Sequence, residues 1–84
     1  MDRIIYEVIV YRIKGDETQV VIYCGAGSNF DFALEEFKLN KTKIQKHTLL
    51  TKDNEEYDYL IQLISKSEYG DDICVIDSFD TREK

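Results

Sequence analysis

The residues best spaced for chemistry lie in VVIYCGAGSNFDFALEEF, residues 20–37, where a glycine-containing turn separates a strand-like run from a helix-like run. Such a turn can hold a phosphate, because a helix N-terminus directs backbone N–H groups at an anion. A dinucleotide fingerprint needs a third glycine where this chain has Phe30, and a Walker loop needs Gly-Lys-Ser or Gly-Lys-Thr. The pattern therefore predicts a structural turn. A small-anion or nucleotide site is the alternative, at Gly25, Gly27, Ser28 and Asn29.

Paired carboxylates could act as a general acid and base, but the candidate pairs in this chain are direct sequence neighbours. Glu35 and Glu36 lie in a helix-like run, where adjacent side chains diverge by about 100°. Asp71 and Asp72 lie in a turn-like segment around which no pocket is predicted. No serine, cysteine or histidine has a catalytic partner indicated by spacing. We therefore expect no catalytic residues and no enzyme activity.

Metal and cofactor binding are also disfavoured. A structural zinc site needs closely spaced cysteines and histidines, whereas this chain has one histidine, His47, and two distant cysteines, Cys24 and Cys74. We expect no metal site and no cofactor. In a reducing compartment both cysteines are expected to be small buried thiols, and a disulfide between neighbouring strands is the alternative for a secreted chain.

Size and charge limit the domain organisation and the classes of partner. The 84 residues are expected to form one domain, 1–84, and the net charge of −6 opposes contact with nucleic-acid phosphates and anionic membranes. No apolar run reaches bilayer-spanning length, and residues 1–13 carry internal charges and no small-residue cleavage site. We expect a cytoplasmic protein with neither a direct nucleic-acid partner nor a membrane partner.

The most distinctive feature is the acidic second part of the chain. Residues 53–83 contain ten acidic residues against Lys66 and Arg82, a balance of −8. Some of these acids have an ordinary explanation as helix caps and turn residues. Their functional interpretation is an acidic surface with exposed tyrosines that contacts a basic partner. The predicted partner-binding residues are Asp53, Glu55, Glu56, Asp58, Tyr59, Glu68, Tyr69, Asp71 and Asp72.

This surface predicts a small non-catalytic protein-binding module. Carboxylates interspersed with tyrosines can satisfy the arginines and lysines of a nucleic-acid-binding surface. The expected partner is therefore a basic, nucleic-acid-handling protein, which the chain inhibits or regulates as a DNA mimic would. A short, acidic, proline-free chain is consistent in composition with small inhibitory proteins of phage or mobile-element origin.

The start of the chain suggests a different function. Residues 3–13 are rich in β-branched residues and tyrosine, and both faces of the strand that they predict are mostly apolar. Such a strand is either covered on both sides within the sheet or exposes a face that a partner covers. The alternative is therefore a homodimeric structural or assembly module, in which Ile9→Glu would alter the molecular mass in solution.

Turn signals and periodicity predict the other elements. Residues 14–17 contain Gly and Asp for a tight turn, so the first strand and a second strand at 18–24 are expected to form an antiparallel hairpin. A helix capped by Ser28 or Asn29 should follow, with a lysine-rich stretch at 38–47. The apolar stripe of this helix is Phe30, Ala33, Leu34 and Phe37.

A third strand is expected at 44–51 and a final strand at 73–76, with 78–84 as an end that frays. Between these strands a second helix should end before Gly70. Its predicted apolar stripe is Tyr57, Leu60, Ile61 and Ile64. The resulting order is β-β-α-β-α-β. It predicts an α+β two-layer sandwich, in which a four-stranded antiparallel or mixed sheet carries both helices on one face.

Overall fold

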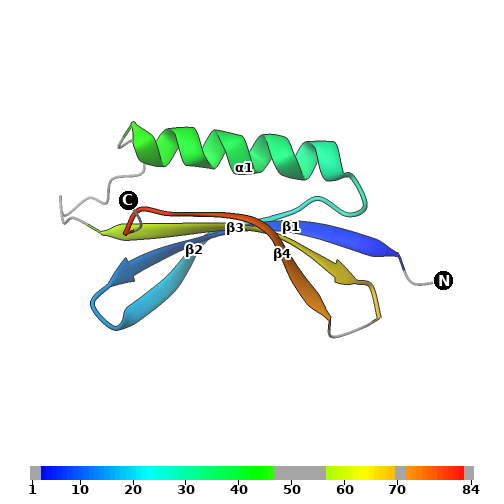
Figure 1. Cartoon of the computed structure of the whole chain (residues 1–84), viewed down its shortest axis with the longest axis horizontal. Helices are drawn as coiled ribbons and strands as arrows, with labels where there is room; N and C mark the ends of the chain where they lie inside the picture. Colours follow the sequence, from blue (N-terminus) through cyan, green and yellow to red (C-terminus); the bar gives the residue numbers. More distant parts are fainter. Residues whose placement is uncertain (1–2, 47–56, 70–71, 83–84) are drawn as a thin grey trace.

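The chain folds into an antiparallel sheet of four strands with one long helix packed on one side, within the residues that the structure describes (Figure 1). The structure is a computed structural model and describes residues 3–46, 57–69 and 72–82. Its sheet order is β2-β1-β3-β4. The architecture is α+β, as predicted. The elements are β1 (Ile4–Lys14), β2 (Glu17–Gly25), α1 (Phe30–Gln45), β3 (Asp58–Ser67) and β4 (Ile73–Asp80).

Strands β1 and β3 form the centre of the sheet, because each pairs with a neighbour on both sides. The predicted hairpin is confirmed: β1 pairs with β2 from Lys14 opposite Glu17 back to Glu7 opposite Gly25. Gly15, in the turn of this hairpin, has a φ of 60°, a left-handed conformation that favours glycine. β1 also pairs antiparallel with β3 along nearly its whole length, and β3 pairs antiparallel with β4.

Helix α1 begins where the sequence predicts. Asn29 is its N-cap, and the Asn29 side-chain oxygen accepts a hydrogen bond of 3.0 Å from the backbone N–H of Phe32. Asp31 in the first turn and Lys43 in the last turn complement the helix dipole. Local signals therefore mark both ends of the helix, and most of the lysine-rich stretch belongs to its second half.

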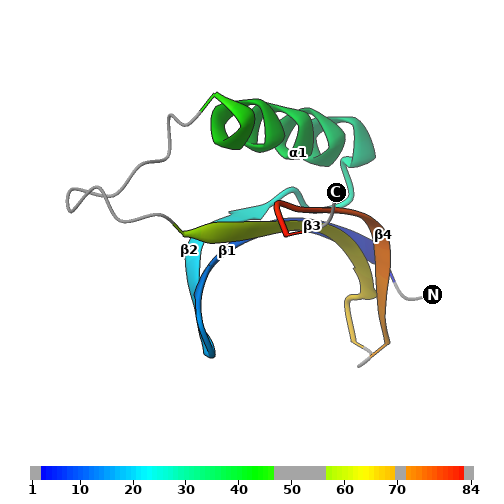
Figure 2. The same cartoon turned by 60° about the vertical axis from the view of Figure 1, so that its left-hand side comes forward.

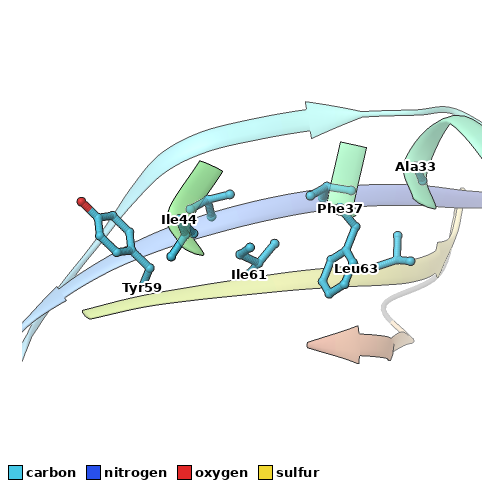
Figure 3. Packing of buried hydrophobic residues seen from close by; sticks show 8 residues of the cluster. Ala33, Phe37, Ile44, Tyr59, Ile61 and Leu63 are labelled. Atoms are coloured by element: carbon cyan, nitrogen blue, oxygen red, sulfur yellow. The ribbon is translucent and has the colours of Figure 1, made fainter. Parts of the chain in front are cut away.

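The hydrophobic core lies between α1 and one face of the sheet (Figure 3). Side chains alternate between the two faces of a strand, so every second residue of β1 and β3 points toward the helix. Val8, Val10, Ile61 and Leu63 do so and are fully buried. The helix packs its stripe against them. The core cluster consists of Val8, Val10, Ala33, Phe37, Ile44, Tyr59, Ile61 and Leu63.

The second predicted helix is corrected by the structure, because this segment is strand β3. Leu60, Ile61 and Ile64 have helical spacing, but the segment is fully extended and pairs with β1. Ile61 and Leu63 lie on the helix side of the sheet, whereas Leu60 and Ile64 lie on the other side. A strand with apolar residues on both faces lacks the alternation that would distinguish it from a helix.

The boundaries of the other predicted elements also change. Ile44 and Gln45 belong to α1, and residues 47–51 of the predicted third strand lie outside the described residues. Strand β4 is longer than predicted and reaches Asp80, so the predicted end at 78–84 starts inside the sheet. The order of the described elements is β-β-α-β-β in place of β-β-α-β-α-β.

The sheet is strongly bent away from the helix (Figure 2). The β1–β2 hairpin end and the β3–β4 hairpin end both curve toward the side opposite α1, so the sheet forms an arch with the helix above it. Each edge strand carries a register irregularity, which leaves Val21 in β2 and Ile76 in β4 as extra residues. Such bulges increase the local twist and bend of a strand.

The cap of α1 yields a first prediction. Replacing Asn29 with Ala removes the acceptor for the Phe32 N–H, so Asn29→Ala should lower the free energy of unfolding by about 1 kcal/mol, measured by urea denaturation. Asn29→Asp keeps an acceptor and should unfold close to wild type. Equal losses in both variants would contradict the capping role.

Candidate functional site

The face of the sheet opposite α1, which we call the open sheet face, is the most distinctive surface of the described chain (Figure 2). It follows from the register, because directly paired residues of neighbouring strands point to the same side. Its polar corner consists of Asp58, Ser78 and Asp80. Its other members are Ile5, Glu7, Ile9, Tyr11 and Ile13 from β1, Leu60, Gln62, Ile64 and Lys66 from β3, Thr18, Val20 and Tyr23 from β2, and Val75 and Ile73 from β4.

Apolar side chains are most exposed along the two edges of this face. Tyr23 on β2 is 61% exposed, and Ile73 on β4 is 64% exposed. Val20 and Val75 lie beside them and are also exposed. An antiparallel sheet with one covered face normally presents polar residues on the other. Exposed apolar side chains along both edges of such a face indicate an interaction surface.

The centre of the open sheet face contains a buried ion pair. Glu7 is only 2% exposed, and its Oε1 lies 2.5 Å from Nζ of Lys66. Glu7 faces Gly25 on β2, which has no side chain, and Ile64 on β3. The bend of the arch brings these side chains together on its inner side. Lys66 therefore neutralises a carboxylate that water hardly reaches, while its own side chain stays partly exposed.

This ion pair yields a second prediction. Lys66→Ala leaves the Glu7 carboxylate buried without its cation, and we expect it to lower the free energy of unfolding by about 1–3 kcal/mol, measured by urea denaturation. Glu7→Gln removes the buried charge and keeps the side-chain shape, so it should cost less. A larger loss for Glu7→Gln than for Lys66→Ala would show that the lysine does not compensate a buried charge.

The predicted acidic residues do not gather in one place within the described chain. Asp58 is at the start of β3, whereas Glu68 and Tyr69 follow its end and Asp72 precedes β4. Ten residues of strand separate the two groups by roughly 30 Å. Tyr69 is 81% exposed. The other predicted acids, Asp53, Glu55, Glu56 and Asp71, lie outside the described residues.

Tyr59 is not part of an exposed acidic surface. It was expected to point away from a helical stripe, but in strand β3 it points toward α1 and belongs to the buried core cluster, beside Ile44 (Figure 3). Tyr59 is buried because this segment forms a strand in place of the predicted helix. Neighbouring residues of a strand point to opposite sides, so Asp58 stays exposed while Tyr59 is buried.

The acids at the start of β3 and the end of β4 already have partners within the chain. Asp58 accepts a hydrogen bond of 3.2 Å from the Thr81 hydroxyl. Asp80 binds the Arg82 guanidinium, with Oδ2 2.7 Å from Nη2, and these hydrogen bonds lower the pKa of the Asp80 carboxyl. This corner therefore has little unpaired acidity to offer a basic partner.

The turn proposed as an anion site closes on the chain itself. The carbonyl of Gly27 accepts the Tyr6 N–H at 2.7 Å, and the Asn29 N–H donates to the carbonyl of Ala26 at 3.1 Å. Gly27 has a φ of 56°, which explains a glycine at this position. Gly25 pairs with Glu7 at the end of β2, and Ser28 is exposed. These contacts give the turn a structural role, and anion binding there stays a prediction.

A pocket of about 150 Å³ near the β1–β2 hairpin was not anticipated from the sequence. The Arg12 guanidinium carbon lies 4.5 Å from the ring centroid of Tyr57, and Lys14 Nζ lies 5.6 Å from it. Arg12 also donates to the side chain of Gln19. Glu17 lines the same pocket and offsets one of the two cations. No sequence signal connects Tyr57 with residues more than forty positions earlier.

The two cysteines lie on opposite edges of the sheet. Cys24 is in β2 and Cys74 is in β4, with β1 and β3 between them, so the strands that carry them are not neighbours. Both thiols are free. The expectation of two buried thiols is corrected, because Cys74 is exposed and Cys24 only partly buried. Within the described residues, no group of three or more His, Cys, Asp or Glu side chains is placed to hold a metal ion.

The cysteines give a third prediction. Burial, together with the nearby Glu36 carboxylate, raises the pKa of the Cys24 thiol and so lowers its thiolate fraction at neutral pH. A maleimide should therefore label exposed Cys74 much faster than Cys24, measured by mass spectrometry over time. The fast phase should persist in Cys24→Ser and disappear in Cys74→Ser. In Cys74→Ser, the slow labelling of Cys24 should accelerate as the pH rises and more of its thiol ionises. Fast labelling of Cys74→Ser at neutral pH would contradict this order.

Comparison with protein-family models, curated proteins and solved structures finds no significant match to this chain. Among the described residues, no helix combines the length and the apolar character needed to cross a membrane.

Proposed function

We propose that this chain is a small, non-catalytic, cytoplasmic protein-binding module whose principal contact surface is the open sheet face. One observation carries the proposal: large apolar side chains are exposed along both edges of a sheet face that α1 does not cover. Tyr23 and Val20 line one edge, and Ile73 and Val75 line the other. Exposed apolar residues gathered on one face, rather than scattered singly, are typical of interaction surfaces.

The free-energy gain from covering this face is substantial. Burial of apolar surface contributes roughly 25 cal/mol per Å², and a large aromatic side chain buries about 150–250 Å² when fully covered. Tyr23 is more than half exposed, so it contributes strongly when a partner covers it. Its hydroxyl can stay at the wet rim of the contact, as is common for tyrosine at interfaces.

A second contact surface is the β3–β4 hairpin end, where Tyr69 is 81% exposed and lies between Glu68 and Asp72 in sequence. An exposed tyrosine with acidic neighbours supports a contact that is guided by charge to a basic, nucleic-acid-handling protein. The chain would inhibit or regulate that protein as a DNA mimic. The hairpin end is a smaller surface than the nine-residue set deduced from the sequence. It works independently of the open sheet face.

The test compares matched surface variants in a pull-down from nuclease-treated host lysate, our fourth prediction. Ile73→Glu places a charge on the open sheet face, and Leu39→Glu places the same charge at an exposed leucine of α1, on the other side of the molecule. Glu68→Lys combined with Asp72→Lys reverses the hairpin charge. Circular dichroism and urea denaturation establish that each variant is folded.

We expect Ile73→Glu to lose the captured protein and Leu39→Glu to retain it. If the hairpin double variant alone loses the partner, and capture by wild type weakens with salt, the acidic hairpin is the contact surface instead. Equal capture by wild type and all folded variants would refute both surfaces.

A further inference from the structure

The geometry points to a second copy of this chain as the partner of the open sheet face, and we propose a symmetric dimer in which two open sheet faces pack on each other. This inference rests on the proposed function, because it names the occupant of the same surface. The two sheets form the inner layers of the dimer, and the two α1 helices lie on the outside.

Charge is the first reason for a second copy. The chain carries −6 overall, but the open sheet face is nearly neutral within the described residues. Glu7 is paired with Lys66, and Asp80 is paired with Arg82, so Asp58 is the remaining charge. A basic partner would find little unpaired carboxylate there. Two copies can meet on this face without bringing their acidic surplus into contact.

The arrangement of the ion pair favours one particular symmetry. A two-fold axis between the sheets and along the strands places β1 of one copy over β3 of the other. Glu7 lies opposite Ile64 and Lys66 opposite Ile5, so the two residues are two positions apart along the strands and their charged ends meet diagonally. The axis then brings the Glu7 carboxylate of each copy near the Lys66 ammonium of the other. Two ion pairs stacked in opposite directions attract each other. An axis across the strands would not align them.

The same axis also brings the two edge strands together. It places β2 of one copy over β4 of the other, because these strands are the two outer strands of the sheet. Tyr23 is paired with Ile9, which lies opposite Gln62, and Val75 is paired with Ile64, so Val75 lies two residues further along the strands than Tyr23. Tyr23 of one copy therefore lies across from Ser78 of the other, and Val75 is the nearest exposed apolar side chain of β4 on this face. Packed sheets lie about 10 Å apart, which such side chains fill.

The available area is appropriate for such a contact. A stable interface buries about 800 Å² on each partner. The exposed parts of Val20, Tyr23, Ile73 and Val75 amount to roughly 400–500 Å². The partly buried side chains at the centre of the face add to this. The face is therefore large enough to form the core of a dimer interface, with its polar corner as part of the rim.

Sedimentation equilibrium of the purified full chain, from micromolar to submillimolar concentration and at low and high salt, tests the dimer and is our fifth prediction. Wild type and Leu39→Glu should reach twice the chain mass, and Ile73→Glu should stay at the mass of one chain. High salt should leave the dimer intact or tighten it, because salt screens the repulsion between two acidic chains.

A cross-linking experiment tests the symmetry. In a background of Cys24→Ser and Cys74→Ser, a bismaleimide that spans the roughly 10 Å sheet spacing should join a Tyr23→Cys chain to a Val75→Cys chain. Tyr23→Cys alone should not cross-link to itself. Self-linking of Tyr23→Cys in place of the mixed product would overturn the proposed axis.

The outcomes separate this inference from the proposed function. A wild-type chain that remains monomeric at every concentration and both salts overturns the dimer. If Ile73→Glu nevertheless loses a lysate partner that Leu39→Glu retains, the open sheet face still binds a protein of a different kind. A dimer that Ile73→Glu leaves intact also overturns the inference, because association then uses another surface.

Discussion

The structure depends on one constraint: within the described residues, one helix covers a sheet whose two central strands are apolar on both faces. Helix α1 contributes one stripe, with Ala33, Phe37 and Ile44 at its centre, and this stripe can cover one face of the sheet only. Val8 and Leu63 lie beneath it. The residues that alternate with them, such as Ile9 and Leu60, are left on the side that α1 does not cover. The contact surface follows from this imbalance.

The bend of the sheet reduces the exposure of the apolar side chains at the centre of the open sheet face. The sheet bends around its open side, and side chains on the inner side of a bend crowd together, so Ile13 and Ile64 are buried although α1 does not touch that face. The same crowding buries Glu7, and Lys66 compensates its charge. Crowding acts at the centre and not at the edges. Tyr23 and Ile73 therefore stay exposed.

The sequence was sufficient to predict the parts of the fold that local signals determine. Asn29 and the stripe that follows it specify α1, and the Gly15 turn between two β-rich runs specifies the first hairpin. Strand β3 could not be distinguished from a helix, because Leu60 and Ile61 are both apolar and only their partners across the sheet decide between the two periods.

The candidate site was predicted in part for the same reason. The β-branched residues of 3–13 correctly indicated a strand, and cover of its second face by a partner stays a prediction. The predicted acidic surface assumed a helical period for the segment that forms β3. That period placed Tyr59 at the surface, whereas in the structure Tyr59 belongs to the buried core. The pairing of Glu7 with Lys66 joins residues nearly sixty positions apart, and such contacts depend on strand register, which single sequences do not encode locally.

The most direct test of the account is methyl NMR of the dilute protein with a soluble paramagnetic agent. If α1 covers one face only, the Ile73 and Val75 methyl signals should broaden strongly, whereas Val8, Ile61 and Leu63 should be protected. Raising the protein concentration should then protect Ile73 and Val75 as partners cover the face. Protection of Ile73 and Val75 in the dilute monomer, or broadening of Ile61 and Leu63, would contradict the central claim that one sheet face is open.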